Sequence, residues 1–355
     1  MKTDHGCVPR LWIAIGLATL SWCAPEELFG QSHADEYLVT TLAVIVPSKE
    51  PDECLTGIAV GGDGAIYVAN ARNGSIYKVV DGKTTLLVDG ALANPTKLFI
   101  DKQGNLFCSA LNNCILYKIS PEGSVTTFAG SGRVGHLDGR KTEAWFDKPG
   151  GLVMDSAGNM FVADNDNHVI RQISVKGDVT TLAGIPRTVG GIDGPAHAAT
   201  FCIPIDITMD AMGNFYVADL HSQRIRKIST TGIVSGVAGV FEFMGQTVVG
   251  TRGHTDGPGH IATFDGPVAL TADAQGNLYV ADLGNRAIRK ITEDGTVSTV
   301  AGNKHLPGVY RDGTTREASF YSPRDIALDT AGNIYVADGT TVRKITPLKR
   351  TPQAR

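Results

Sequence analysis

The chain has 355 residues, of which 42 are glycine, 42% are hydrophobic and 19% are charged. Its 36 acidic and 32 basic residues give a net charge of −4, which excludes the basic footprint of a nucleic-acid-binding protein. Many glycines with few aromatic residues favour short strands joined by tight turns, and long helices are not expected.

The first segment differs from the remainder. Lys2 and Arg10 precede an apolar run over residues 11–24, which has the charge and length of a secretory signal peptide and is too short to span a bilayer. Residues 1–34 are therefore predicted to be a signal peptide, with the cleavage point left open. This signal peptide predicts that the mature chain is exported, either to the periplasm or to the extracellular space, and no later segment is apolar enough to cross a membrane.

A repeated pattern runs through the rest of the chain. The segment Gly-Asn-Met-Phe-Val-Ala-Asp that begins at Gly158 recurs, in close or degraded form, at Gly64, Gly104, Gly213, Gly276 and Gly332. A proline stands nine residues before five of these six glycines, and Leu55 takes its place in the first copy. Each copy predicts four strands, named a to d from the proline onward, because Gly-Asn and Asp-Gly pairs favour tight hairpins between them.

One four-stranded sheet cannot bury both of its faces alone, whereas six sheets arranged radially can. The sequence therefore predicts an all-β fold, a single six-bladed β-propeller of four-stranded antiparallel blades over residues 35–346, with a basic tail at 347–355. The predicted blades cover approximately residues 51–90, 91–130, 149–184, 204–239, 267–302 and 323–346.

The two ends of the predicted propeller complement each other. The sixth copy lacks strand d, and a copy of that strand, Val39-Thr40-Thr41-Leu42-Ala43, stands near the start of the chain. We expect a strand at residues 38–45 to complete blade six, so that the ring is closed by its own N-terminal strand and leaves no open edge between blades.

The repeated motifs resemble those of the NHL-repeat family. The shared patterns are Pro-x-x-Ile-x-x-Asp, Gly-Asn-x-Tyr-Val-Ala-Asp and Asn-x-x-Ile-Arg-Lys-Ile, over essentially all of residues 38–346. The resemblance implies the propeller fold without fixing an activity, because the family includes binding modules as well as amidating lyases that hold a metal in the channel. No segment matches the metal-ligand or catalytic motif of the lyases, so no residue role is carried over.

Strand direction sorts the connections onto two faces. The d-to-a and b-to-c connections share one face, here called the long-loop face, and the a-to-b and c-to-d turns share the other, the short-turn face. Long d-to-a loops at residues 131–148, 185–203, 240–266 and 303–322 all lie on the first face. Loops of this length in a compact fold are usually functional or disordered, so we expect binding on the long-loop face.

Positions that break the repeat are the best functional candidates, because the scaffold explains the repeated ones. Two residues after the proline position, the six copies read Gly57, Lys97, Gly151, Asp206, Ala269 and Asp325. We expect a polar channel mouth, able to bind a small polar ligand or a peptide end, lined by Lys97, Asp206, Arg324, Asp325, His168 and His221. The alternative is that these charges neutralise one another.

Two further features leave alternatives open. The longest loop carries a hydrophobic cluster that predicts a partner-binding patch if it is exposed, or a hairpin covering a blade if it folds back: Phe241, Phe243, Met244, Val248 and Val249. Cys108 and Cys114 flank a short hairpin loop and form either a cross-strand disulfide or two buried thiols.

Recurring charges are interpreted as architecture, because a catalytic group is needed once and a structural one in every blade. The last residue of strand b is an aspartate that faces an arginine of strand c, as in Asp164 and Arg171. Asp-Gly pairs in the long loops, such as Asp138-Gly139, are predicted to cap a helical turn whose phenylalanine fills the space between blades. They lack the alternating oxygen ligands of a calcium loop.

These observations favour a non-catalytic, exported scaffold that binds a protein, peptide or glycan with its long-loop face, and predict no cofactor. The alternative is a metal-dependent lyase or lactonase-like enzyme, with zinc or calcium in the central channel and its site at the channel mouth.

Overall fold

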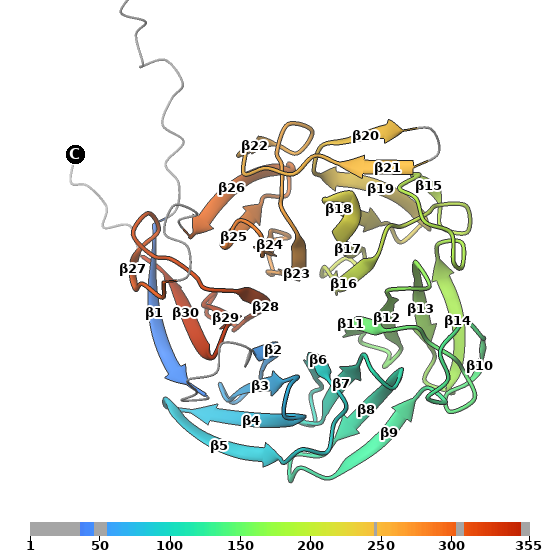
Figure 1. Cartoon of the computed structure of the whole chain (residues 1–355), viewed down its shortest axis with the longest axis horizontal. Coiled ribbons are helices and arrows are strands. Elements are labelled where there is room, and N and C mark those ends of the chain that lie inside the picture. The colour runs from blue at the N-terminus through green and yellow to red at the C-terminus, as the bar shows by residue number, and fades with distance from the viewer. Residues whose placement is uncertain (1–35, 46–54, 245–246, 303–308, 349–355) are drawn as a thin grey trace, which may run out of the picture. The chain divides into compact units, whose positions relative to one another are not determined.

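The computed structural model describes residues 36–45, 55–244, 247–302 and 309–348. These residues form six antiparallel blades around a central channel (Figure 1). The predicted signal peptide, Cys54, His305 and most of the basic tail lie outside the described residues. The one helical element in the described part of the chain is a single turn, η1 (Leu220–Ser222), and no helix there is long and apolar enough to cross a membrane.

Each blade consists of strands a to d in radial order from the channel outward. Blade 1 contains β2 (Leu55–Val60), β3 (Ile66–Asn70), β4 (Ser75–Val80) and β5 (Lys83–Val88). Blade 2 contains β6 (Pro95–Ile100), β7 (Leu106–Ala110), β8 (Ile115–Ile119) and β9 (Val125–Ala129). Blade 3 contains β11 (Pro149–Met154), β12 (Met160–Asp164), β13 (Val169–Ile173) and β14 (Asp178–Ala183).

The other three blades repeat this order. Blade 4 contains β16 (Pro204–Met209), β17 (Phe215–Asp219), β18 (Arg224–Ile228) and β19 (Ile233–Ala238). Blade 5 contains β23 (Pro267–Ala272), β24 (Leu278–Asp282), β25 (Ala287–Ile291) and β26 (Thr296–Ala301). Blade 6 contains β28 (Pro323–Leu328), β29 (Ile334–Asp338), β30 (Thr341–Pro347) and β1 (Tyr37–Val44).

Short extra strands distinguish blades 3 to 6 from the predicted four-stranded pattern. A two-residue strand from each long loop pairs with the outermost strand: β10 (Gly139–Arg140), β15 (Gly194–Pro195), β22 (Gly257–Pro258) and β27 (Gly313–Thr314). The longest loop also forms a separate hairpin, β20 (Phe241–Met244) with β21 (Thr247–Gly250), at the outer rim of the ring (Figure 1).

Closure of the ring by the N-terminal strand is confirmed. Strand β1 pairs antiparallel with β30, from Tyr37 opposite Pro347 to Val44 opposite Thr341. Tyr37 and Val39 are buried in the hydrophobic cluster between blades 5 and 6. Residues from opposite ends of the described chain therefore share one sheet, which removes the exposed edge that β30 would otherwise present.

Packing between blades buries almost every side chain of the b strands. All five residues of β12, for example, are buried, because a blade is covered by a neighbour on each face. A phenylalanine from each long loop is completely buried between two blades, as predicted: Phe146, Phe201, Phe264 and Phe320.

A buried arginine in each of blades 3 to 6 joins the long loop to the blade. In blade 3, Arg171 donates to Asp164 Oδ2 (2.9 Å) and to Asp138 Oδ1 (2.7 Å), and its guanidinium lies 5.1 Å from the ring centroid of Phe146. Two backbone carbonyls of the same loop accept further hydrogen bonds from Nη1 and Nη2, and Nε has no hydrogen-bond partner among the described residues. The equivalent groups are Arg226 with Asp219 and Asp193, Arg289 with Asp282 and Asp256, and Arg343 with Asp338 and Asp312.

This geometry corrects the predicted role of the Asp-Gly aspartates. Asp138 is an acceptor for Arg171 rather than the cap of a helical turn, and Asp256 also accepts from the backbone N–H of Thr299 on the outermost strand. Blades 1 and 2 have Tyr77 and Tyr117 where the others have the arginine, and the connection before blade 2 is short. The arginine is therefore present where there is a long loop to hold.

The predicted disulfide alternative for Cys108 and Cys114 does not form. Both residues are buried free thiols, as is Cys202. Cys108 lies opposite Tyr117 in the ladder, whereas Cys114 stands in the turn with a φ of 53°, so the two side chains are not cross-strand partners. Burial raises the pKa of Cys108 to about 12, which keeps this thiol protonated and unreactive.

We expect removal of β1 to destabilise the whole ring. A chain that begins at residue 55 exposes the edge of β30 and loses the burial of Tyr37 and Val39. Burying such side chains contributes about 1.5–3 kcal/mol each, so the free energy of unfolding should fall by at least about 3 kcal/mol in urea titrations. A chain that begins at Glu36 keeps β1 and is the control. Equal stability of the two chains would contradict closure by this strand.

Loss of a buried arginine should cost far more than loss of an exposed one in the same blade. Arg171→Met leaves Asp164 fully buried without its cation, which typically costs about 3–5 kcal/mol. Arg140→Met removes a 2.9 Å pair with Asp178 whose side chains are 65% and 51% exposed, which should cost less than about 1 kcal/mol. Urea unfolding of both variants measures the difference, and similar losses would refute the structural role of Arg171.

Candidate functional site

The inner strand of every blade lines the channel, and its backbone is irregular at one place. The pairing between strands a and b shifts just after the first residue, as between Pro95 and Lys97 in blade 2. The same shift occurs in all six blades. Such bulges re-aim the neighbouring side chains. The third residue of each inner strand lies at this bulge, and it is the position at which the residue type differs among the six copies.

Small and charged residues alternate around the ring at this third position. Blades 1, 3 and 5 carry Gly57, Gly151 and Ala269, and blades 2, 4 and 6 carry Lys97, Asp206 and Asp325. A Cβ atom on Gly57 would lie 2.6 Å from the carbonyl oxygen of Thr96, and one on Gly151 would overlap the carboxylate of Asp206. Gly151 therefore leaves the space that the Asp206 side chain occupies, and Gly57 lets the inner strand of blade 2 approach closely.

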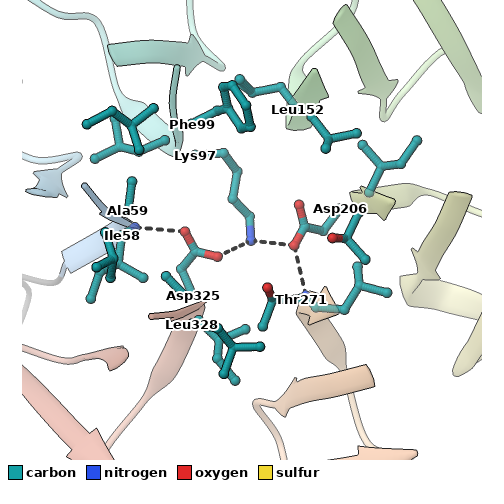
Figure 2. Close-up of a pocket in the computed structure, with 18 residues that line it drawn as sticks. Ile58, Ala59, Lys97, Phe99, Leu152, Asp206, Thr271, Asp325 and Leu328 are labelled. Carbon is teal, nitrogen blue, oxygen red and sulfur yellow. Dashed lines mark hydrogen bonds and ion pairs between the residues drawn. The ribbon is translucent and has the colours of Figure 1, made fainter. Parts of the chain in front are cut away.

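The three charged residues meet at the channel axis (Figure 2). Lys97 Nζ lies 2.7 Å from Asp325 Oδ1 and 3.1 Å from Asp206 Oδ2, and it also donates to the backbone carbonyl of Val268 (3.3 Å). Asp206 accepts from the N–H of Leu270 and Asp325 from the N–H of Ile58. The network therefore links blades 1, 2, 4, 5 and 6 directly.

Burial and charge pairing set the protonation states of this network. Burial raises the pKa of Asp325 to about 6, against the opposing effect of Lys97, and it also raises the pKa of Asp206. For Lys97, burial lowers the pKa, but the two carboxylates together hold it above its usual value. Burial thus works against the charge on both carboxyl groups, and the ammonium of Lys97 works for it.

The network divides the channel into two cavities. The long-loop cavity has a volume of about 140 Å³ and is lined by the second residues of the inner strands and by b-to-c connections. The short-turn cavity has a volume of about 250 Å³ and is lined by residues from the third position onward in all six inner strands. Lys97 is the residue common to both cavities.

The residues predicted at the channel mouth do not all line the same cavity. Arg324 lines the long-loop cavity, whereas Asp206 and Asp325 line the cavity on the opposite side of Lys97. The four charges therefore do not form one polar mouth, and three of them neutralise one another in part, which was the alternative left open above. Arg324 itself is exposed and forms no ion pair with any described residue.

The two predicted histidines lie outside both cavities. His168 is half-buried at a φ of 58° in the b-to-c turn of blade 3, and its Nδ1 accepts the backbone N–H of Ile203 (3.3 Å). Burial lowers its pKa. His221 is exposed in η1. Within the described residues no three His, Cys, Asp or Glu side chains are grouped so that they could hold a metal ion.

Asn165 is the site residue that the sequence analysis missed. It follows strand β12 directly, is 2% exposed and lines the long-loop cavity, where its Oδ1 has no hydrogen-bond partner. Gly150 makes room for it, because a Cβ there would lie 2.6 Å from Asn165 Oδ1. The position was open to detection, since the other five copies have apolar or small residues after strand b: Ala71, Leu111, Leu220, Leu283 and Gly339.

The hydrophobic loop cluster is partly folded back and partly exposed. Phe241 packs against the guanidinium of Arg224, 3.9 Å from the ring centroid, and edge-on against Phe243. Phe243 and Val249 are 59% and 44% exposed. The side chains of Met244 and Val248 lie outside the described part of the structure.

One family model and several curated proteins match parts of this chain. The NHL repeat family model matches residues 201–228, the first three strands of blade 4. Teneurin-4 from Homo sapiens is 28% identical over 237 residues, which cover 60% of this chain but 8% of the teneurin. NHL repeat-containing protein 2 from Homo sapiens is 30% identical over 182 residues, 47% of this chain and 24% of that protein.

Solved structures share the architecture at lower identity. A Bacteroides thetaiotaomicron protein of unknown function has a TM-score of 0.68 and 22% identity, covering 88% of this chain and 76% of that one. An auxiliary nutrient binding protein from the same organism has a TM-score of 0.65 and 15% identity, over 87% and 76%. Virginiamycin B lyase from Staphylococcus aureus has a TM-score of 0.54 and 14% identity, covering 88% of this chain and 100% of that one. These identities show the fold alone.

Removing the central ammonium should destabilise the ring in a pH-dependent way. Lys97→Met leaves Asp206 and Asp325 buried and facing each other, which costs about 3–5 kcal/mol while both are ionised. Carboxyl groups whose folded pKa is raised contribute stability below that pKa and lose it as the pH rises. The variant should therefore lose much less stability at pH 5 than at pH 8. Lys102→Met, at an exposed turn, is the control, and a pH-independent loss would refute the network.

Proposed function

We propose that this chain, which is a six-bladed β-propeller of NHL repeats, is an exported, non-catalytic binding scaffold that holds a protein, peptide or glycan on its long-loop face. The observation that carries the proposal is the long-loop cavity, which lies on the side of Lys97 that bears the long loops and whose lining includes exposed Arg324 and buried Asn165.

The chemistry of this cavity suits a small group with both polar and apolar parts. Asn165 keeps a buried carbonyl oxygen without a partner, which costs about 1–3 kcal/mol unless a ligand donor satisfies it. Arg324 offers a guanidinium that matches a carboxylate. The walls between them are apolar, from Leu111, Ile205 and Val268. A peptide end with an aliphatic side chain provides all three kinds of contact.

The surrounding loops extend the surface that a partner meets. The hairpin of β20 and β21 belongs to the longest loop of the same face and leaves Phe243 and Val249 exposed. Exposed aromatic and aliphatic side chains are common anchors in protein interfaces. The buried arginines of blades 3 to 6 hold the bases of these loops, so the face is presented on a rigid support.

The fold by itself does not select this function. Propellers with 14% and 15% identity to this chain include a virginiamycin B lyase and an auxiliary nutrient binding protein. The proposal therefore rests on the side chains of the site, and it includes no cofactor.

Replacing Asn165 should separate binding from stability. Asn165→Leu has a similar volume and removes an unsatisfied buried polar group, so the free energy of unfolding should stay the same or increase by up to about 1–3 kcal/mol. A purely structural asparagine would give the opposite sign. Thermal and urea unfolding of the variant measure this effect.

Binding is tested on arrays of peptides with free or amidated C termini, printed beside a glycan array. Bound probes should lose at least tenfold in affinity with Asn165→Leu and with Arg324→Met, and deletion of residues 241–249 should weaken protein-sized partners further. Arg252→Met, a rim residue of the same face whose side chain is 70% exposed, is the control. Unchanged affinities in the two site variants, or stoichiometric zinc or calcium in the purified protein that binding requires, would contradict the proposal.

A further inference from the structure

The short-turn cavity is a second site, on the side of Lys97 away from the long loops. Its volume is about 250 Å³. Its walls are made by the inner strands of all six blades. Because the Lys97 network separates it from the long-loop cavity, it is reached from the short-turn face.

Apolar and polar side chains occupy different sides of this cavity. Phe99, Leu152 and their neighbours from blades 1 to 3 form an apolar wall, and Leu328 extends it in blade 6 (Figure 2). Blades 4 and 5 contribute Thr208 and Thr271, whose hydroxyls hydrogen-bond to no described residue. A ligand with an apolar body and one polar end therefore matches the lining.

The charge of the cavity selects the sign of that polar end. Asp206 and Asp325 are 6% and 4% exposed and share the single ammonium of Lys97, so the floor has two carboxyl groups for one ammonium. A charge in such a poorly hydrated site acts more strongly than one in water. The floor therefore attracts cations and repels anions.

The rim on this face has the same sign. An aspartate stands in the a-to-b turn of each of blades 2 to 6, at Asp101, Asp155, Asp210, Asp273 and Asp329. Each of these aspartates accepts hydrogen bonds from the asparagine four residues later. Burial opposes the charge on Asp210 and Asp329, but these hydrogen bonds hold their pKa below the usual value.

The balancing cations stand farther from the axis. Lysines of the c strands lie over aromatic rings of the b strands, as Lys118 does over Phe107 and Lys227 over Tyr216. A groove of about 510 Å³ continues from the cavity between the turns of blades 2 and 3, where it shares Phe99 and Ile100 with the cavity and contains Asp101, Asp155 and Lys102. The path to the floor is thus lined by more carboxylates than ammonium groups.

We propose that the short-turn cavity binds a small organic cation, a primary ammonium carried on an apolar chain. The ammonium lies against Asp206 and the hydroxyls of Thr208 and Thr271, and the chain lies along Phe99 toward the groove. This site is independent of the long-loop cavity, because the ligands reach opposite sides of Lys97.

Three probes of equal length test the proposal by titration calorimetry on the full chain: hexylamine, 1-hexanol and hexanoate. We expect hexylamine to bind at least tenfold more tightly than hexanoate, with 1-hexanol between them. Equal affinities of hexylamine and hexanoate, or no binding of hexylamine, would overturn the proposal.

Variants locate the binding within the fold. Asp206→Asn leaves Lys97 paired with Asp325 and should reduce the affinity for hexylamine at least tenfold with little change for 1-hexanol. Thr208→Trp fills the cavity without altering the floor and should abolish binding of hexylamine and of 1-hexanol. This variant tests the location of the site if Asp206→Asn proves too unstable to assay. Arg324→Met, on the other side of Lys97, should leave all three affinities unchanged. Retained hexylamine binding in Thr208→Trp would contradict binding in the short-turn cavity, and it would not bear on the proposal for the long-loop cavity.

Discussion

A ring of blades leaves a hole at its axis, and in this protein a single ammonium shared by two carboxylates fills it. Lys97, Asp206 and Asp325 come from alternate blades, and the blades between them carry glycine or alanine at the same position, where Gly151 leaves room for Asp206. Buried ion pairs are weak sources of net stability, and in some proteins they specify how the elements are arranged. Here the arrangement fixes which blades face each other across the axis and closes the channel, so that each face has its own cavity.

The buried arginine–aspartate groups of blades 3 to 6 lie only on the long-loop side of the described blades and make the two faces different. In blades 3 to 6 a fully buried arginine holds two aspartates, one from its own blade and one from the long loop. The loops are thereby anchored at their bases while their outer residues remain available to a partner. The short-turn face has no such loops, and its mouth is shaped by the tight turns and their aspartates instead. The scaffold thus has a broad surface on one side and, on the other, a small pocket whose floor has two carboxyl groups and one ammonium.

The sequence was sufficient for the fold because each repeat carries its own strand and turn signals, and the copy of strand d at Val39–Ala43 revealed the closure. It also marked Lys97, Asp206 and Asp325 as exceptions to the repeat. It could not show that these residues meet, since Lys97 is 109 and 228 positions away from its two partners. Nor could it show on which side of the ammonium each residue lies, because that depends on a bulge in the inner strand.

The same limit applies to the residues at the rim of the site. His168 and Asn165 stand three residues apart in one turn, yet Asn165 reaches the cavity and His168 turns outward to bond Ile203. His168 was predicted at the site because its side chain titrates near neutral pH in its ordinary form. The buried carboxamide oxygen of Asn165, which has no partner, is the stronger sign of a ligand. The Asp-Gly aspartates were assigned a local role because their arginine partners lie more than thirty residues later.

The division of the channel by Lys97 is tested most directly by nitrogen-15 NMR of the lysine ammonium groups. A buried, doubly paired ammonium exchanges its protons slowly, so the account predicts one ammonium signal that survives at pH 7, is assigned to Lys97 by its loss in Lys97→Met, and shows a contact to Val268. Exchange of Lys97 as rapid as that of the exposed lysines would contradict a closed channel.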